Sequence, residues 1–90
     1  MDAAVAFGNV LRRLRLEAAL TQEQLGLEAD LRRTYISILE LGSQQPTLTT
    51  ILKLARALGR PASEVLEKVE AEIAAMKRRE GASRRARSTD

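Results

Sequence analysis

The sequence predicts an all-α fold of five helices, with an extended fifth helix and a basic tail. Apolar residues recur at spacings of three and four, which is the period of one helix face. No segment shows the period-two alternation of a strand, and capping or turn residues divide the chain into pieces of helical length. The 90 residues suffice for one domain with a modest core.

Local signals place the ends of these helices. Thr21 is a favourable N-cap, and Gln24 three residues later completes a capping-box pattern. Thr47 is a second favourable N-cap, while Gly42 and Gly59 are suitable C-terminal stops for the third and fourth helices. The expected helices are approximately Ala3–Ala18, Gln22–Glu28, Arg32–Leu41, Leu48–Leu58 and Ala62–Arg79.

The apolar residues of each helix predict the face that it buries. The first helix carries one stripe, made of Phe7, Val10, Leu11 and Leu14. The residues of the fourth helix expected to face inward are Leu48, Ile51, Leu52, Ala55 and Leu58.

The stripe of the fifth helix extends beyond the reach of so small a domain, through Val69, Ile73 and Met76. An apolar stripe with nothing beneath it requires a partner helix, so the sequence predicts a two-fold homodimer through these three residues. The alternative is that the stripe folds back on Val5 and Phe7 of its own chain.

Composition argues against several classes of function. The chain has no cysteine and no histidine, which removes disulfides, zinc fingers, thiol nucleophiles and imidazole catalysis. Its two aromatic residues, Phe7 and Tyr35, are too few for a surface that stacks single-stranded bases. There is no membrane-spanning apolar run, secretory signal or phosphate-binding glycine loop. We therefore expect a cytoplasmic protein that is not an enzyme and needs no metal, cofactor, membrane or small-molecule ligand.

The charge is unevenly distributed. The chain through residue 76 is nearly neutral, with nine Lys or Arg against ten Asp or Glu, whereas the remainder has six against two. Residues 1–76 are thus predicted to form the domain, and residues 77–90 a basic tail that ends the helix and is then flexible. Such a tail suits nucleic acid or an anionic surface, although a solvated terminus and a nonspecific nucleic-acid binder remain alternatives.

The segment from Thr21 to Gly42 has the pattern of a helix-turn-helix. Gly26 provides a small residue where the two short helices approach, and Leu31 an apolar residue in their connection. The second helix begins with the polar residues Arg32, Arg33 and Thr34. Because the first residues of a recognition helix contact base edges in the major groove, this segment predicts a partner of double-stranded DNA.

These residues resemble the helix-turn-helix of the phage repressor and Cro family, and the match extends from about Phe7 to Val69. The matching stretches are Thr21–Gly26, Leu31–Ser37 and Leu39–Gly42, followed by Pro46 and Thr47. Residues 33–37 further resemble the recognition helix of restriction–modification controller proteins. The resemblance implies a repressor-like fold in a bacterial or phage-encoded regulator of transcription. Such a regulator acts as a homodimer on a near-palindromic operator and can regulate its own synthesis.

The resemblance also implies a role for individual residues. The base-reading positions are Arg33, Thr34, Ser37 and Ile38. The phosphate-contacting positions are Thr21, Gln22, Arg32, Tyr35, Ser43, Gln44 and Thr47. Arg15 and Glu40 match a buried structural ion pair, whereas Arg12 and Arg13 are expected to be solvated.

Three apolar residues stand where the family usually has polar or charged ones, namely Leu27, Ile38 and Leu41. Ile38 can contact a thymine methyl group. Alternatively, the three form an apolar patch that binds another protein, as in an antitoxin or adaptor, with or without DNA binding.

Overall fold

The computed structural model describes residues 2–88, and the side chains of residues 2–81, and it is all-α, as predicted. Its helices are α1 (Ala3–Glu17), α2 (Gln22–Ala29), α3 (Arg33–Glu40), α4 (Leu48–Ala57) and α5 (Ala62–Ser88). The expected bounds of the first four differ from these by at most one residue at either end. None of the described helices is both long enough and apolar enough to cross a membrane.

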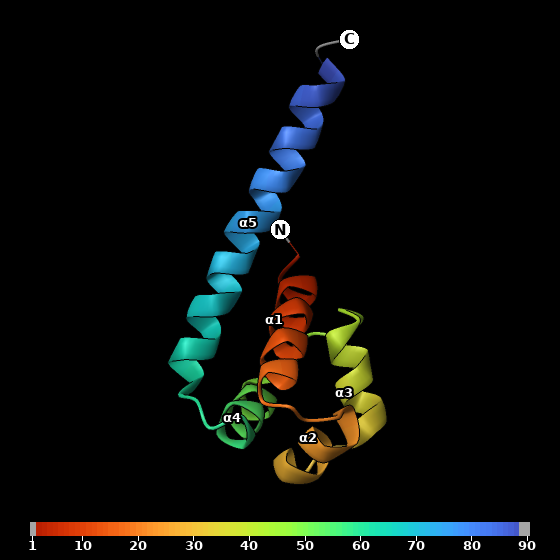
Figure 1. Ribbon diagram of the computed structural model, residues 1–90, viewed down its shortest axis with the longest axis vertical. Helices are drawn as coiled ribbons and strands as arrows, with labels where there is room; N and C mark the ends of the chain where they lie inside the picture. Colours follow the sequence, from red (N-terminus) through yellow and green to blue (C-terminus); the bar gives the residue numbers. More distant parts are fainter. Residues whose placement is uncertain (1, 89–90) are drawn as a thin grey trace.

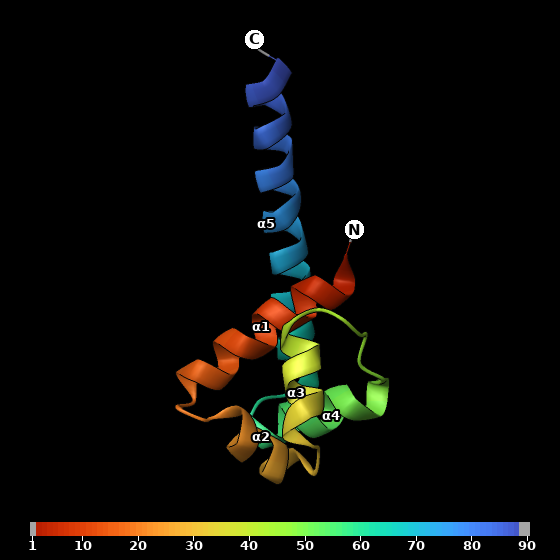
Figure 2. The same cartoon turned by 90° about the vertical axis from the view of Figure 1, so that its right-hand side faces the viewer.

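Helix α1 lies at the centre of the molecule, with α5 along one side and α3 along the other (Figure 1). Helix α2 packs against α3 and α4, and α4 also packs against α5; Figure 2 shows these three shorter helices together below α1. The molecule measures 51 × 24 × 24 Å, because α5 continues well past the beginning of α1 (Figure 1).

The core receives apolar side chains from all five helices. The predicted stripe of α1 is buried, and Leu25 of α2, Ile36 and Leu39 of α3, and Leu54 of α4 are each at most 2% exposed. Removing a buried leucine or isoleucine side chain down to alanine typically costs about 2–5 kcal/mol, so these residues hold α2 and α3 firmly on α1.

The prediction for α4 is confirmed for three of its five residues, since Ala55 is buried and Ile51 and Leu58 pack half-buried against the core, and it is wrong for the other two. Leu48 and Leu52 are 68% and 52% exposed, whereas Thr50 and Leu54 are buried. A buried hydroxyl is costly unless it is hydrogen-bonded. In the structure, the Thr47 hydroxyl donates to Thr50 Oγ1 at 3.0 Å and removes that cost.

The apolar stripe of α5 packs against the core of its own chain. The prediction that nothing lies beneath this stripe in the monomer is therefore wrong. Val69 is only 8% exposed, and the half-buried Ile73 and Met76 pack against the same core. The reason is that α1 and α5 run side by side over this length, which gives the stripe an apolar neighbour within the monomer (Figure 1).

Helix α5 also ends later than predicted, at Ser88 rather than about Arg79. The added segment contains no proline, and its single glycine, Gly81, weakens a helix without ending it. Residues 89–90 of the predicted tail lie outside the described residues, and the division of the chain at residue 76 stays a prediction.

Two glycines permit the close contacts that position α2 and α3. A Cβ atom at Gly8 would collide with the backbone carbonyl oxygens of Leu39 and Glu40, where α1 crosses α3. A Cβ atom at Gly26 would lie 2.6 Å from the carbonyl oxygen of Leu31, in the connection between α2 and α3. The sequence indicated a close approach at Gly26, while that of Gly8 is visible only in the tertiary structure.

Candidate nucleic-acid interface

A short connection sets α3 against α2. Asp30 ends α2 in the left-handed region, with φ 57°, a conformation that Asp adopts more readily than most residues. The Leu31 amide then donates to the Gly26 carbonyl at 2.8 Å, and Arg32 is extended. The chain therefore reverses within three residues and presents the first turn of α3.

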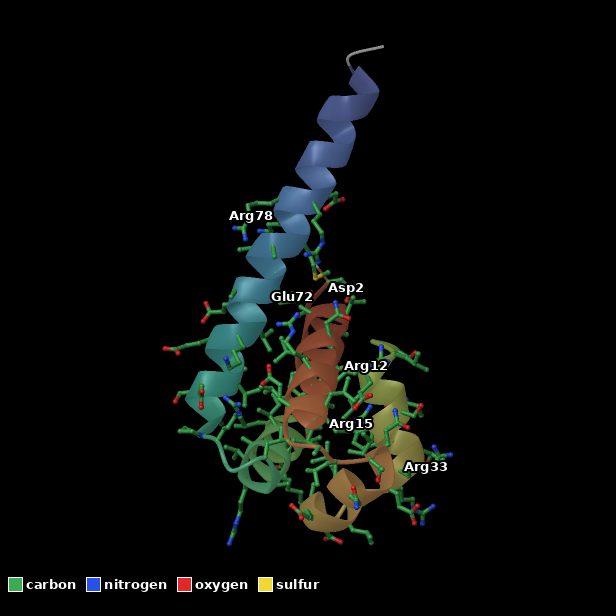
Figure 3. All side chains as sticks on the ribbon, in the orientation of Figure 1. Asp2, Arg12, Arg15, Arg33, Glu72 and Arg78 are labelled. Atoms are coloured by element: carbon green, nitrogen blue, oxygen red, sulfur yellow. The ribbon has the colours of Figure 1, made fainter. Side chains whose placement is uncertain are left out.

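The outward face of α3 carries the predicted base-reading residues. Ile36 and Leu39 are fully buried, so the opposite side of the helix is directed away from the core. Arg33 and Thr34 are exposed at its start, and Ser37 and Ile38 are half-buried; Figure 3 shows Arg33 pointing outward. A helix of this kind can present a cation, a hydroxyl and an apolar group to base edges.

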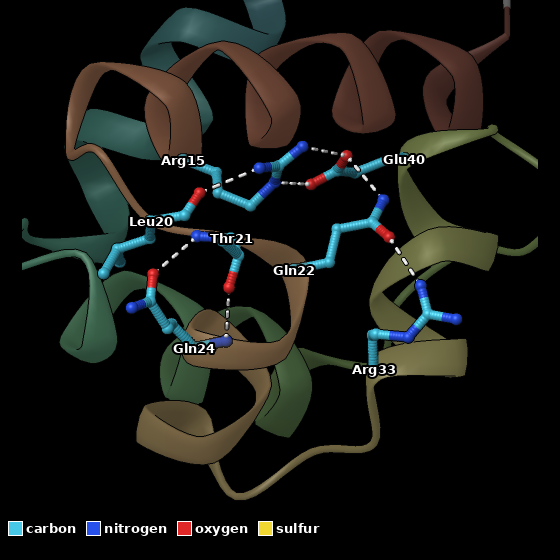
Figure 4. A network of polar contacts seen from close by, with 7 residues as sticks. All are labelled: Arg15, Leu20, Thr21, Gln22, Gln24, Arg33 and Glu40. Carbon is cyan, nitrogen blue, oxygen red and sulfur yellow. Dashed lines mark hydrogen bonds and ion pairs between the residues drawn. The ribbon is translucent and has the colours of Figure 1, made fainter.

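A buried ion pair joins α1 to the end of α3. Arg15 Nε donates to Glu40 Oε2 at 2.6 Å and Arg15 NH2 donates to Glu40 Oε1 at 3.0 Å (Figure 4). The third bond, from Arg15 NH1 to the Leu20 carbonyl at 2.8 Å, reaches the segment before α2. The hydrogen bonds with Glu40 raise the pKa of Arg15, burial opposes that rise, and the carboxylate charge adds to it.

Gln22 extends this pair to Arg33. Its Nε2 donates to Glu40 Oε1 at 3.1 Å, and Arg33 NH1 donates to Gln22 Oε1 at 3.5 Å (Figure 4). The last contact is long and therefore weak, but it restricts the directions that the Arg33 side chain takes. The sequence does not indicate this connection, because Gln22 lies far along the chain from both partners.

The predicted phosphate-contacting residues occupy two segments beside α3 and the beginning of α3 itself. Thr21 caps α2, since its Oγ1 accepts the Gln24 amide at 3.1 Å, which leaves its hydroxyl hydrogen available. Thr47 caps α4 by accepting the Thr50 amide at 3.1 Å. The exposed members of the set with no side-chain hydrogen bond given by the structure are Arg32, Ser43 and Gln44, and Tyr35 is half-buried against the core.

Leu27 and Leu41 are 77% and 74% exposed, the highest values among the large apolar residues described. Leu27 lines a hollow with Asp30 and Arg32 before α3, and Leu41 lines another, between α1 and α3, with Ser37 and Glu40. Ile38, the third residue of the predicted apolar patch, is half-buried.

A second polar cluster joins α1 to α5, away from the face of α3. Glu72 is buried and accepts bonds from Asn9 Nδ2 at 2.9 Å, Arg13 NH2 at 3.3 Å and Arg79 NH2 at 3.4 Å. The Asn9 hydrogen bond chiefly lowers the pKa of Glu72, burial opposes it, and the Arg13 and Arg79 cations lower it further. Arg13 is thus paired rather than merely solvated, which the sequence did not indicate.

Comparisons with known proteins show which family has this sequence and architecture. A helix-turn-helix family model matches residues 11–65, which contain both α2 and α3. Control protein C.BamHI of Bacillus amyloliquefaciens is 40% identical over 62 residues, which cover 68% of this chain and 76% of that protein. Control protein C.MunI of Mycoplasma sp is 38% identical over 72 residues, or 79% of this chain and 97% of that protein.

Among solved structures, the restriction–modification controller protein C.AhdI from Aeromonas hydrophila is similar at 40% identity and a TM-score of 0.67. The match covers 69% of this chain and 94% of C.AhdI. The chain therefore belongs to the helix-turn-helix family and is a DNA-binding transcriptional regulator of the restriction–modification controller type.

Proposed function

We propose that the protein is a homodimer that reads a near-palindromic operator with α3 and regulates its own transcription unit. The observation that carries this proposal is the position of Arg33. It is exposed on the first turn of α3 and is connected through Gln22 to the buried pair of Arg15 and Glu40. An arginine held at a helix start is suited to bidentate bonding with guanine O6 and N7.

Specificity and affinity come from different residues in this proposal. Arg33 and Thr34 contact base edges, with Ser37 and Ile38 reading positions farther along the groove. The residues that contact phosphate are Thr21, Gln22, Arg32, Tyr35, Ser43, Gln44 and Thr47. They fix the register of α3 and supply most of the salt-dependent affinity.

The proposed dimer places two α3 helices about one DNA turn, roughly 34 Å, apart. Val69 is too well buried to contribute much to an interface, and Ile73 and Met76 retain only part of their surface. Leu48 and Leu52 are one turn apart on α4 and more than half exposed. We therefore centre the dimer interface on these two leucines instead of on the predicted stripe of α5.

The proposal includes a cytoplasmic location and no catalysis, cofactor or small-molecule ligand. Regulation then follows protein concentration, which sets the fraction of dimer on the operator. Titration of the protein–operator complex with candidate cellular metabolites tests this point, since a several-fold change in affinity would contradict it. The antitoxin or adaptor alternative is not favoured, because the similar proteins are control proteins and transcriptional regulators.

Base reading by Arg33 is tested with a duplex selected from a random pool by the wild-type protein. We expect Arg33→Ala to weaken binding to that duplex by about 1–3 kcal/mol for each half-site, or roughly fivefold to 150-fold. Binding to random duplexes of the same length should change far less. Arg78→Ala is the matched control, since Arg78 is an exposed arginine of α5, which lies on the other side of α1 from α3 (Figure 3). Equal losses on selected and random duplexes would refute base reading by Arg33.

A further inference from the structure

We propose that Arg12 of α1 is a further contact to the DNA backbone, which neutralises a phosphate next to α3. This inference rests on the proposed function, because it assumes that α3 lies in the major groove. It extends the DNA-binding surface from the helix-turn-helix to α1, a helix to which the sequence assigned only structural roles.

The first support is the position of Arg12. It lines a surface hollow between α1 and α3 whose other members are Arg15, Gln22, Ser37, Glu40 and Leu41. Two of these, Gln22 and Ser37, are proposed DNA contacts. Figure 3 shows Arg12 on the side of α1 that faces α3, one helical turn from Arg15. A DNA strand that follows Gln22 and Ser37 therefore passes within reach of the Arg12 side chain.

The second support is the charge of this hollow. The Glu40 carboxylate accepts two bonds from Arg15 and one from Gln22, so its negative charge is already compensated. Arg15 is buried, and its third hydrogen bond is donated to the Leu20 carbonyl. Arg12 is exposed and has no ion-pair partner among the side chains that the structure describes. It supplies one uncompensated positive charge, which suits a phosphate oxygen.

The neighbouring residue provides an internal comparison. Arg13 has the same charge and lies on the same helix, but it points to α5 and donates to Glu72 at 3.3 Å. Successive helical residues differ by about 100° in direction. Both arginines border the hollow that contains Glu72, but only Arg12 also lines the hollow between α1 and α3. If the position of an arginine in the hollow decides whether it contacts DNA, Arg12 contributes to binding and Arg13 does not. If the general positive charge of α1 decides, both arginines contribute.

The experiment compares wild type, Arg12→Gln and Arg13→Gln in the full chain. Affinity is measured by fluorescence anisotropy for the selected duplex and for a random duplex, across a series of salt concentrations. We expect Arg12→Gln to weaken both complexes by the same factor, roughly threefold to tenfold, and to lower the salt slope by about 1.8, because each protomer of the dimer loses one phosphate contact. Arg13→Gln should keep the wild-type slope, and circular dichroism should show that both variants are folded.

The outcomes separate this inference from the function on which it rests. If the wild-type protein prefers its selected duplex but Arg12→Gln keeps the full salt slope, the contact of Arg12 is refuted and the proposed function stands. The contact is likewise refuted if Arg13→Gln lowers the slope equally. If the wild-type chain selects no duplex at all, both the proposed function and this inference fail.

Discussion

Glu40 is the residue on which the orientation of α3 depends most directly. Its carboxylate accepts bonds from Arg15 of α1 and Gln22 of α2, and its backbone carbonyl lies over Gly8. Three helices therefore meet at one side chain. The guanidinium of Arg33, the residue proposed to read a base, has a long contact of 3.5 Å with Gln22, which in turn donates to Glu40.

Replacing Glu40 tests this dependence at the scale of the residue. Glu40→Gln leaves the Arg15 guanidinium buried without its counter-charge, which typically costs about 3–5 kcal/mol. We expect that loss in the free energy of unfolding, measured by urea denaturation. Glu28→Gln is the matched control, since Glu28 is an exposed acid on α2. A loss below about 1 kcal/mol would show that the pair contributes little to stability.

Helix α5 is held to α1 by apolar packing and by Glu72. The folded-state pKa of Glu72 is lowered, first by the Asn9 hydrogen bond and then by Arg13 and Arg79. A lowered pKa means that the stabilisation is fully present above the unfolded value, about 4.3, and is lost as pH falls through the folded pKa. Arg13 and Arg79 are more than half exposed, so solvent screening limits their contribution.

The corresponding prediction concerns the contribution of Glu72 to the packing of α5 against α1. We expect Glu72→Gln to lower the free energy of unfolding by about 1 kcal/mol near neutral pH. The difference from wild type should shrink as the pH falls below about 4. Glu67→Gln, an exposed site on the same helix, controls for the loss of one negative charge. Urea denaturation from pH 3 to pH 7 measures both, and a difference that grows on acidification would contradict the assignment.

At the scale of the whole molecule, the prediction concerns the proposed dimer interface on α4. We expect the double variant Leu48→Gln, Leu52→Gln to sediment as a folded monomer at concentrations where the wild-type protein is a dimer. Losing two exposed apolar side chains removes interface area without disturbing the core. Leu16→Gln is the control, since Leu16 is 55% exposed on α1 and lies outside this face. A dimer that survives the double variant but dissociates in Ile73→Gln would return the interface to α5.

The sequence predicted most of the fold because the decisive signals are local. Thr21 and Gln24 form the capping box that their spacing indicates, and Thr47 caps α4. Each of these bonds joins residues three positions apart, so its geometry follows from the helix itself. The positions of Arg33 and Thr34 at an exposed helix start follow from the same local rules.

The remaining features depend on which surfaces meet, and no short-range pattern contains that information. The sequence by itself determined five helices, the ends of the first four to within one residue and a helix-turn-helix that presents Arg33. Only the tertiary structure decided that Leu48 and Leu52 of α4 face outward. It also decided that the apolar stripe of α5 is covered by α1 of the same chain. The physical reason is that an apolar side chain can be buried against any apolar surface, so periodicity predicts a face but not its partner.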